Sequence, residues 1–392
     1  MHPFDRLTLE TLRAKSCLKW THYSALQGAR DVLPLWVADM DFPPAQAIIG
    51  ALEARARSGN LGYPAGYPGG EPGLQAAVAA WLDARHGWRV AESDIWPLHG
   101  VIPGLYLGVR ALASSGEAVV LQPPLYPPFM AAVADTGRET QHNPLVWTGT
   151  QWAFDLDQLD ALIRPHTRAL VLCNPHNPTG RVFSREELAA LAELVLRHRL
   201  WVISDELHSD LVYPGAQHVP FASLGDEVAE RTVTLLGPTK SFNLAGLKVG
   251  FVITQNAALR KRLERLGAGL VTPPNVMAQA AARAAYTQGA GWLEDTLAYL
   301  QRNRDLVTRF VEAYLPGSAY APPEGTYLAW LDLRGLGLGE TLYERLLACG
   351  VGLSEGRHNG PGGEGFARLN FATTTTILEE ALERLRGGLR LG

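Results

Sequence analysis

The chain has 392 residues, of which 47% are hydrophobic and 19% charged, with a formal net charge of −4. These values are typical of a globular enzyme with a large core, and they give no general attraction to nucleic acid or to anionic membranes. No apolar stretch approaches the ~20 residues of a membrane span, and no signal peptide is readable. Three widely spaced cysteines argue against a disulfide framework, so we expect a cytoplasmic protein.

The N-terminal residues 1–44 are rich in turn formers, and prolines such as Pro34 limit helix formation there. We therefore expect an extended arm that leads into a turn. Beyond the arm, helical spacing predicts two helices separated by a loop rich in Gly, Pro and Tyr. These three segments are Ala45–Ser58, Leu61–Gly70 and Glu71–Arg85.

The segment HGVIPG (His99–Gly104) precedes a stretch with helical spacing, Leu105–Ala113. Glycine lets the backbone approach a ligand closely, and Pro103 suits the first turn of a helix. The free N–H groups at a helix start, together with the helix dipole, form an anion site without a basic side chain. We therefore expect the N–H groups of Val101 and Ile102 to bind a phosphate.

Two apolar runs, Ala118–Gln122 and Ala169–Cys173, predict strands. Tyr126 follows the first run in a Pro-rich turn, so its ring is a rigid flat surface that suits stacking on a planar ligand; the alternative is an aromatic plug of the core. The second run leads into NPHNPTG (Asn174–Gly180), whose Asn residues can also cap turns.

The stretch Trp201–Phe251 contains two further apolar runs that suit buried strands of an α/β sheet. The first run delivers Asp205 and the second delivers Lys240. Ligands of open α/β sheets sit at the carboxyl ends of the strands, so we expect the carboxylate and the amine to face one crevice. A buried lysine beside a carboxylate is one way to hold pyridoxal phosphate, with lysine as the Schiff base and the carboxylate on the protonated ring nitrogen.

The strand Val249–Thr254 follows Val233–Gly237 too closely for a crossover helix, so the two should be antiparallel or not adjacent. Asn275–Tyr314 is mostly helical and is expected to join two lobes. The last segments predict a compact α+β lobe: Tyr327–Leu333, Glu340–Cys349, Ala367–Phe371 and Thr376–Arg386.

The predicted fold is therefore α/β. A large domain at residues 45–285 has a mostly parallel, seven-stranded-type mixed sheet flanked by helices, and a smaller α+β domain is built from residues 1–44 plus 286–392. The eleven histidines show no pair with metal-ligand spacing, so no metal site is predicted.

Several motifs carry a family resemblance. NPHNPTG, SDELHSDL (Ser204–Leu211) and PTKSFNLAGLK (Pro238–Lys248) together resemble the aspartate-aminotransferase-like, fold-type-I pyridoxal-phosphate enzymes. LPLWVADMDFPP (Leu33–Pro44), LKW (Leu18–Trp20) and KSFNLAGL are similar to the MalY/PatB-type cystathionine β-lyase branch of that family. The motifs extend from about Trp20 to Asn370, which is nearly the whole chain.

The resemblance implies roles for residues at the matching positions. Lys240 would bind the cofactor and act as general base, Asp205 would pair with the ring nitrogen, and Asn177 would bond the ring hydroxyl oxygen. Tyr63 would reach across a homodimer interface to the partner's cofactor phosphate; the alternative is a tightly packed loop. The other expected cofactor-binding residues are Val101, Ile102, Tyr126, His208, Thr239 and Lys248. His208 would line the site or pack under the ring; the alternative is a structural histidine.

Substrate contacts are also implied. Arg368, in FARLNFA, would clamp the α-carboxylate, because a guanidinium matches a carboxylate in a bidentate arrangement; the alternative is a surface arginine on an edge strand. Trp36 and Asp39 would lie near the substrate, although acidic residues in a loop are often solvated. Many relatives carry Arg where this chain has Lys248 and Ser where it has Gly237, so the details of the phosphate site differ here.

Three functions follow from these motifs. The first is a carbon–sulfur β-lyase that acts on cystathionine or other cysteine S-conjugates. The second is a class I aminotransferase, which shares every residue named above up to loss of the α-proton. The third is a regulatory binding protein that retains the fold.

Overall fold

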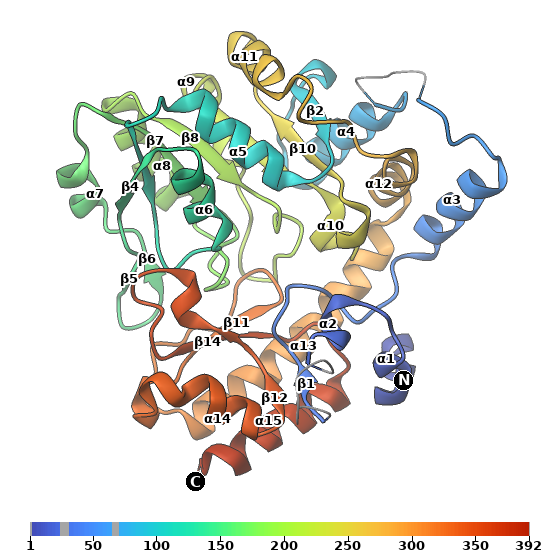
Figure 1. The fold of residues 1–392 in the computed structure, drawn as a ribbon, viewed down its shortest axis with the longest axis vertical. Helices are drawn as coiled ribbons and strands as arrows, with labels where there is room; N and C mark the ends of the chain where they lie inside the picture. Colours follow the sequence, from blue (N-terminus) through green and yellow to red (C-terminus); the bar gives the residue numbers. More distant parts are fainter. Residues whose placement is uncertain (1, 24–30, 65–69, 392) are drawn as a thin grey trace.

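The structure is a computed structural model that describes residues 2–23, 31–64 and 70–391. Part of the Gly/Pro/Tyr-rich loop Leu61–Gly70 therefore lies outside the described residues. Figure 1 shows a larger upper lobe around a central sheet and a smaller lower lobe that contains the C-terminal strands and helices. The long helix α13 (Ala290–Tyr314) runs between the two lobes.

The upper lobe contains a seven-stranded mixed sheet in the order β2-β10-β9-β8-β7-β3-β4. Strands β9, β8, β7, β3 and β4 are parallel, and β10 is antiparallel to both of its neighbours. The mixed sheet predicted from the sequence is thus confirmed, as is the antiparallel strand after β9. The strand bounds are β2 Ile95–Leu98, β3 Ala118–Leu121, β4 Glu139–His142, β7 Thr167–Cys173, β8 Trp201–Asp205, β9 Thr232–Leu236 and β10 Gly250–Ile253.

Helices cover both faces of this sheet because successive strand residues point to opposite sides. Val119 and Leu121 pack in one apolar cluster with α5 (Val101–Leu112), whereas Val120 packs in another with α8 (Arg185–Arg197). The other helices of this lobe are α3 Gln46–Arg57, α4 Leu74–His86, α6 Pro128–Asp135, α7 Leu156–Leu162, α9 Asp226–Ala229, α10 Pro238–Ser241, α11 Ala257–Gly267 and α12 Val276–Gln288.

Helix α5 lies very close to the sheet. A Cβ at Gly104 would lie 2.7 Å from a methyl carbon of Val252, and one at Gly108 would lie 3.1 Å from Ile203. Glycine at both positions removes the side chain that would push the helix away. The helix begins at Val101, directly after Gly100, which is earlier than the Leu105 start predicted from spacing. The first turn of α5 therefore lies at the carboxyl edge of the sheet.

The lower lobe contains an antiparallel three-stranded sheet in the order β11-β14-β13, and a short parallel pair of β1 with β12. β1 belongs to the N-terminal arm, so the arm packs on the C-terminal lobe. The domain division at residues 44 and 285 stays a prediction. The bounds are β1 Leu33–Pro34, β11 Leu328–Asp332, β12 Val351–Gly352, β13 Ser354–Glu355, β14 Phe366–Asn370, α14 Leu342–Ala348 and α15 Thr375–Leu389, and a separate hairpin joins β5 Val146–Trp147 to β6 Trp152–Ala153.

The arm is not simply extended, which corrects the prediction from the sequence. It contains the 3-10 helix η1 (Pro3–Arg6) and the short helices α1 (Leu9–Arg13) and α2 (Leu18–Thr21). Thr8 caps α1 by accepting a hydrogen bond from the N–H of Thr11 at 3.1 Å. Such one-turn helices depend on caps and packing, and hydrophobic spacing does not reveal them.

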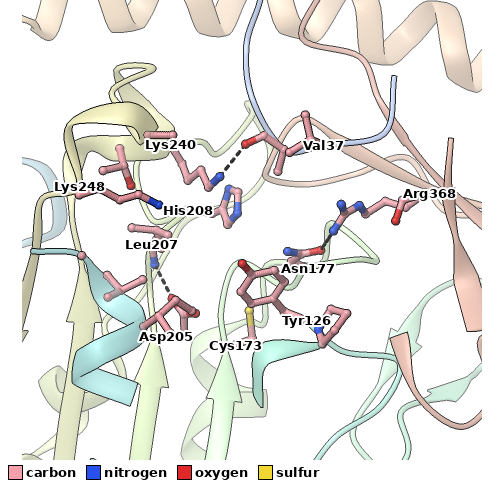
Figure 2. Close-up of a pocket in the computed structure, with 18 of the residues that line it drawn as sticks. Val37, Tyr126, Cys173, Asn177, Asp205, Leu207, His208, Lys240, Lys248 and Arg368 are labelled. Carbon is pink, nitrogen blue, oxygen red and sulfur yellow. Dashed lines mark hydrogen bonds between the residues drawn. The ribbon is translucent and has the colours of Figure 1, made fainter. Parts of the chain in front are cut away.

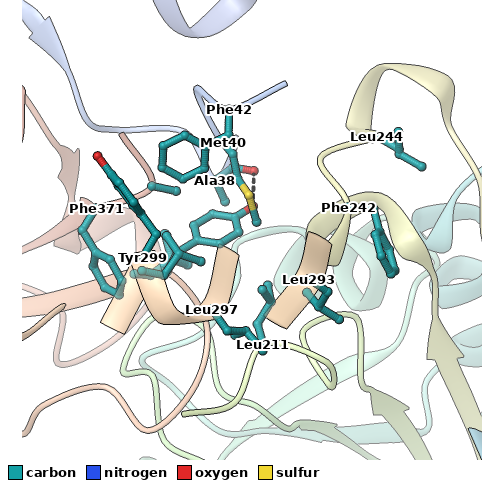
Figure 3. Close-up of a cluster of buried hydrophobic side chains, with 14 of the residues drawn as sticks. Ala38, Met40, Phe42, Leu211, Phe242, Leu244, Leu293, Leu297, Tyr299 and Phe371 are labelled. Atoms are coloured by element: carbon teal, nitrogen blue, oxygen red, sulfur yellow. Dashed lines mark hydrogen bonds between the residues drawn. The ribbon is translucent and has the colours of Figure 1, made fainter. Parts of the chain in front are cut away.

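Figure 3 shows how the end of the arm is held in the core. Met40 and Phe42 pack against α13, where the ring of Phe42 lies 5.2 Å from that of Tyr299 in an edge-on arrangement. Asn243 accepts a hydrogen bond from the N–H of Met40 and donates to the carbonyls of Met40 and Phe42. These bonds attach the arm to Asn243, which lies two residues after α10, the helix that contains Lys240. Among the described residues, no helix combines the length and the apolarity needed to cross a membrane.

Candidate active site

A cavity of about 630 Å³ lies at the carboxyl ends of the central strands, where the arm and the lower lobe close over the sheet. Figure 2 shows that its polar side chains point inward from both lobes. Most of the site residues predicted from the sequence line it. They are Trp36, Val101, Ile102, Tyr126, Asn177, Asp205, His208, Thr239, Lys240, Lys248 and Arg368.

Lys240 lies in the one-turn helix α10, which begins just after β9 ends. Its Nζ donates a hydrogen bond of 2.6 Å to the carbonyl of Ala38 in the arm. Burial lowers the pKa of Lys240 to about 8; Asp39 and Asp205 oppose this shift, whereas Arg368 and Lys248 add to it. A lysine with this pKa is partly unprotonated near neutral pH, as a nucleophile or a general base must be.

Asp205 is the last residue of β8. Burial raises its pKa to about 6; a hydrogen bond from the N–H of Leu207, at 3.1 Å, and the charge of Lys240 act against this, and Glu206 acts with it. No cationic side chain of the described residues lies within ion-pair distance of this carboxylate. A buried carboxylate without a cation is costly, so the site suits a ligand that brings a positive charge.

Arg368 reaches the cavity from β14 in the lower lobe and is only 7% exposed. It donates to Asn177 Oδ1 at 2.8 Å and to the carbonyl of Trp36 at 3.1 Å, whereas its Nε has no partner among the residues that the structure describes. Burial lowers its pKa to about 10. Within the described part of the chain, no carboxylate pairs with this guanidinium, so the site suits an anionic ligand.

The opposite end of the cavity is formed by the first turn of α5, with Val101 and Ile102, and by the side chains of Thr239 and Lys248. The first N–H groups of an α-helix have no partner within the helix and carry its positive dipole end. A Cβ at Gly250 would lie 2.9 Å from the nitrogen of Val101, so strand β10 closes this end tightly. The arrangement suits a phosphate group.

The centre of the cavity contains the Tyr126 ring and the side chains of Leu207 and His208. Burial raises the pKa of the Tyr126 hydroxyl and lowers the pKa of His208 to about 3, with Lys240 and Arg368 adding to the latter shift. His208 is therefore neutral, and its buried Nδ1 has no hydrogen-bond partner within residues 2–23, 31–64 and 70–391. A flat aromatic ring and an unpaired ring nitrogen both suit a planar ligand with polar substituents.

Two predicted residues lie elsewhere. The carboxylate-bearing Asp39 does not line the cavity, although its charge acts on Lys240, and its backbone carbonyl accepts from Asn370 at 2.7 Å. Tyr63 is 84% exposed and lines a second cavity with Leu61 and the loop 272–276. The predicted roles of both residues stay predictions.

The cavity also contains residues that sequence reasoning did not single out. Cys173 ends β7 beside Asp205, and Leu207 lies two residues after Asp205, so their position at the strand ends is a signal that could have been used. Ser354 and Asn359 come from the lower lobe, and no local pattern marks them. Asn359 binds both backbone groups of Leu125, and so ties the lower lobe to the Tyr126 loop.

Taken together, these groups fit pyridoxal 5′-phosphate. The cofactor has an aldehyde for the Lys240 amine, a ring nitrogen for Asp205, a flat ring for Tyr126 and a phosphate for the first turn of α5. Arg368 has no anionic partner among the described residues. The fold and the site thus define a fold-type-I enzyme of amino-acid chemistry.

Comparison with known proteins identifies the family. A family model described as aminotransferase class I and II matches residues 30–385, so the chain belongs to that family. It is 40% identical over 379 residues to cystathionine beta-lyase PatB of Bacillus subtilis (strain 168), covering 95% of this chain and 96% of that protein. It is 32% identical over 381 residues to protein MalY of Escherichia coli (strain K12), with 95% and 96% covered.

Solved structures agree with this assignment. The crystal structure of cystalysin from Treponema denticola, which contains a pyridoxal 5′-phosphate cofactor, superposes with a TM-score of 0.90 at 31% sequence identity. The match covers 96% of this chain and 97% of that one. The family resemblance inferred from the motifs is confirmed.

Proposed function

We propose that the protein is a pyridoxal-phosphate-dependent carbon–sulfur β-lyase, which cleaves cystathionine or other L-cysteine S-conjugates to a thiol, pyruvate and ammonia. One observation carries the proposal: among the described residues, Asp205 has no cation and Arg368 has no carboxylate, and both face the cavity that holds the Lys240 amine. The cofactor's ring nitrogen and the substrate's carboxylate would complete these charges.

Each residue then has a defined task. Arg368 binds the α-carboxylate of the substrate and fixes the direction of its α-carbon. The unprotonated Nζ of Lys240 takes the α-proton, for which its pKa of about 8 is well placed. Asp205 keeps the ring nitrogen protonated, and Tyr126 covers the ring. Bound pyridoxal phosphate supplies the sink for the electron pair that proton removal leaves.

Elimination requires a particular pose. The electron pair left when the α-proton is removed would form the Cα–Cβ double bond as the thiolate leaves Cβ, so the substrate's Cβ–S bond would have to be held in line with that electron pair. Arg368 Nη1 donates a hydrogen bond to Asn177 Oδ1 at 2.8 Å, and both residues line the cavity. By binding the substrate's carboxylate, this pair can hold that pose. The names of PatB and its relatives favour this reaction over transamination.

The experiment is to supply L-cystathionine and S-alkyl cysteines to the holoenzyme and to measure pyruvate, ammonia and thiol. Borohydride reduction before proteolysis should leave the cofactor attached to the peptide that contains Lys240. Pyruvate release with little glutamate formed from 2-oxoglutarate supports the lyase. The second candidate function is an aminotransferase, because the family name includes that activity. Rapid amino transfer without pyruvate release would favour the aminotransferase over the lyase. If the cofactor-loaded protein catalyses neither reaction, a binding role is favoured.

We also propose a homodimer with shared sites. The second cavity is lined by Leu61 and Tyr63, which are 60% and 84% exposed. Leu270 is 67% exposed and lies two residues before Thr272, which also lines that cavity. Exposed apolar surface of this kind suits a partner. Inactive Tyr63→Ala and Lys240→Ala protomers should regain activity when mixed, because one site of the hybrid has both intact residues. If activity does not recover after verified subunit exchange, Tyr63 acts in the site of its own chain or has only a structural role.

The same proposal includes the location of the enzyme in the cell and its division into two domains. The free cysteines Cys17, Cys173 and Cys349 suit a reducing compartment, and we place the enzyme in the cytoplasm. Cell fractionation tests this placement. The large domain at residues 45–285 and the small domain at 1–44 plus 286–392 would close on the substrate from either side of the cavity.

A further inference from the structure

The phosphate end of the cavity lacks a side-chain donor at position 237. Gly237 follows β9, and a Cβ there would lie 3.0 Å from the carbonyl oxygen of Val249 and 3.1 Å from the Cα of Gly250. The neighbouring backbone thus crowds this position, which offers no hydroxyl. The described side chains that can donate at this end are Thr239, Lys248 and one residue without an assigned role, His99.

His99 lies between the two cavities. It lines the active-site cavity immediately before the first turn of α5, and its Nδ1 is 3.0 Å from the carbonyl oxygen of Thr272. Thr272 lines the second cavity, together with Tyr63, and does not line the first. Nδ1 is therefore engaged outside the active-site cavity, and Nε2 is the ring nitrogen that remains for a ligand in it.

The contacts with Thr272 occupy Nδ1 alone. It lies 3.0 Å from the Thr272 carbonyl oxygen, to which it can donate, and 3.5 Å from the Thr272 hydroxyl, from which it can accept. Nε2 has no intramolecular partner among the described residues, and it is the ring nitrogen that can donate to an anion bound in the cavity. Lys248 is a charged side chain at this end, and it also favours an anion there.

We propose that His99 is a ligand of the cofactor phosphate: Nε2 donates a hydrogen bond to a phosphate oxygen while Nδ1 remains bound to Thr272. This inference rests on the proposed function, because it takes pyridoxal phosphate as the ligand. His99 would supply, from the α5 side, a charge-assisted donor at a phosphate site where Gly237 supplies none.

The test compares two probes, pyridoxal 5′-phosphate and pyridoxal, which differ only by the phosphate. Their binding to cofactor-free protein is measured by quenching of tryptophan fluorescence. Four variants are compared with the wild type: His99→Ala, His99→Asn, His99→Gln and, as the control, His166→Ala, which lies before β7 at the opposite end of the sheet. Asn keeps a donor near the Nδ1 position, whereas Gln places one near Nε2.

We expect His99→Ala and His99→Asn to bind pyridoxal 5′-phosphate about 10- to 100-fold more weakly, as loss of one charge-assisted hydrogen bond implies. Gln should recover part of the loss, and pyridoxal binding should change by less than about twofold in every variant. The His166→Ala control should match the wild type with both probes.

Three outcomes would overturn the assignment. Equal weakening for both probes would mean that His99 only supports the local fold, and unchanged binding would mean that it does not touch the phosphate. If His99→Asn retains more pyridoxal 5′-phosphate binding than His99→Gln, the role of His99 lies in its contact with Thr272. If the wild-type protein itself binds neither probe, the proposed function fails instead, so the two failures are distinct.

Discussion

The segment Ser204–Leu211 has two sides that differ in how well their polar groups are bonded. On the side away from the cavity, Glu206 accepts from Ser204 Oγ at 2.7 Å, from the N–H of Phe221 at 3.0 Å and from His218 at 3.0 Å. Asp210 accepts in the same way from Trp81, Ser241 and His86, at 2.9, 3.0 and 3.1 Å. On the cavity side, counting the described residues, the Asp205 carboxylate accepts one hydrogen bond and His208 Nδ1 has none.

The pKa directions follow this difference. Burial alone would raise the pKa of Asp210, but its contacts with His86, Trp81 and Arg85 lower it below the ordinary value. Burial of Asp205 raises its pKa to about 6, because the bond from Leu207 only partly offsets the cost. One side of the segment thus stabilises the fold, and the other stores an electrostatic cost that a ligand can relieve.

The largest effect on stability is expected at Asp210. Asp210→Ala leaves three buried donors without an acceptor and should cost about 3–5 kcal/mol, seen as a large fall in thermal midpoint. Ser241→Ala, which removes a single one of these bonds, should cost about 1 kcal/mol. The lowered pKa of Asp210 also means that its contribution is present at neutral pH and is lost as the pH falls toward acid. Equal midpoints for Asp210→Ala and wild type would remove the contrast between the two sides.

Asp205→Asn should give the opposite pattern. Turnover should fall about a hundredfold, because a neutral amide cannot keep the cofactor's ring nitrogen protonated. The folded pKa of about 6 lies above the unfolded value of about 4, so the wild-type carboxylate lowers the stability of the cofactor-free protein progressively between those pH values. The variant should therefore be more stable than wild type at pH 7 without cofactor, by on the order of 1–3 kcal/mol. If Asp205→Asn is less stable than the wild type under these conditions, the buried Asp205 carboxylate does not destabilise the cofactor-free protein.

Two buried arginines repeat the comparison. Arg181 is 5% exposed and pairs with Glu187 at 2.6 Å and with Glu324, whereas Arg368 is 7% exposed and has no carboxylate partner in the described part of the chain. Arg368→Ala should lower kcat/KM about 10²-fold, mainly through KM, because it removes the anchor of the substrate carboxylate. Arg368→Lys keeps the charge and should lose less. Arg181→Ala should instead lower the thermal midpoint, and a similar loss of midpoint in Arg368→Ala would assign Arg368 to the fold.

Sequence patterns predicted the cavity side of this segment better than its surroundings. Asp205 and Lys240 each follow a buried apolar run, and strand ends of an α/β sheet converge, so their meeting could be inferred. The contact between Arg368 and Asn177 depends on how the two lobes pack, and no local pattern encodes it. The same holds for Ser354 and Asn359 in the cavity. The short arm helices were missed because caps such as Thr8, not periodicity, specify them.

The smallest effect, and the sharpest in pH, concerns Lys240 in the cofactor-free protein. Its folded pKa of about 8 lies below the ordinary value of 10.5, so the unfolded chain binds the proton more tightly. Stability should therefore rise as the pH increases from about 8 to 10.5, and the full cost of the buried charge is present below pH 8. Lys240→Met removes that cost at similar volume and should raise the free energy of unfolding at pH 7 by on the order of 1–2 kcal/mol, which includes a reduction for water penetration and is seen as a higher thermal midpoint. The gain should shrink at pH 10. Lys261→Met, at an exposed position on α11, is the matched control and should show no such pH dependence. A gain that is independent of pH would mean that packing, and not the buried ammonium, limits stability at this side of the cavity.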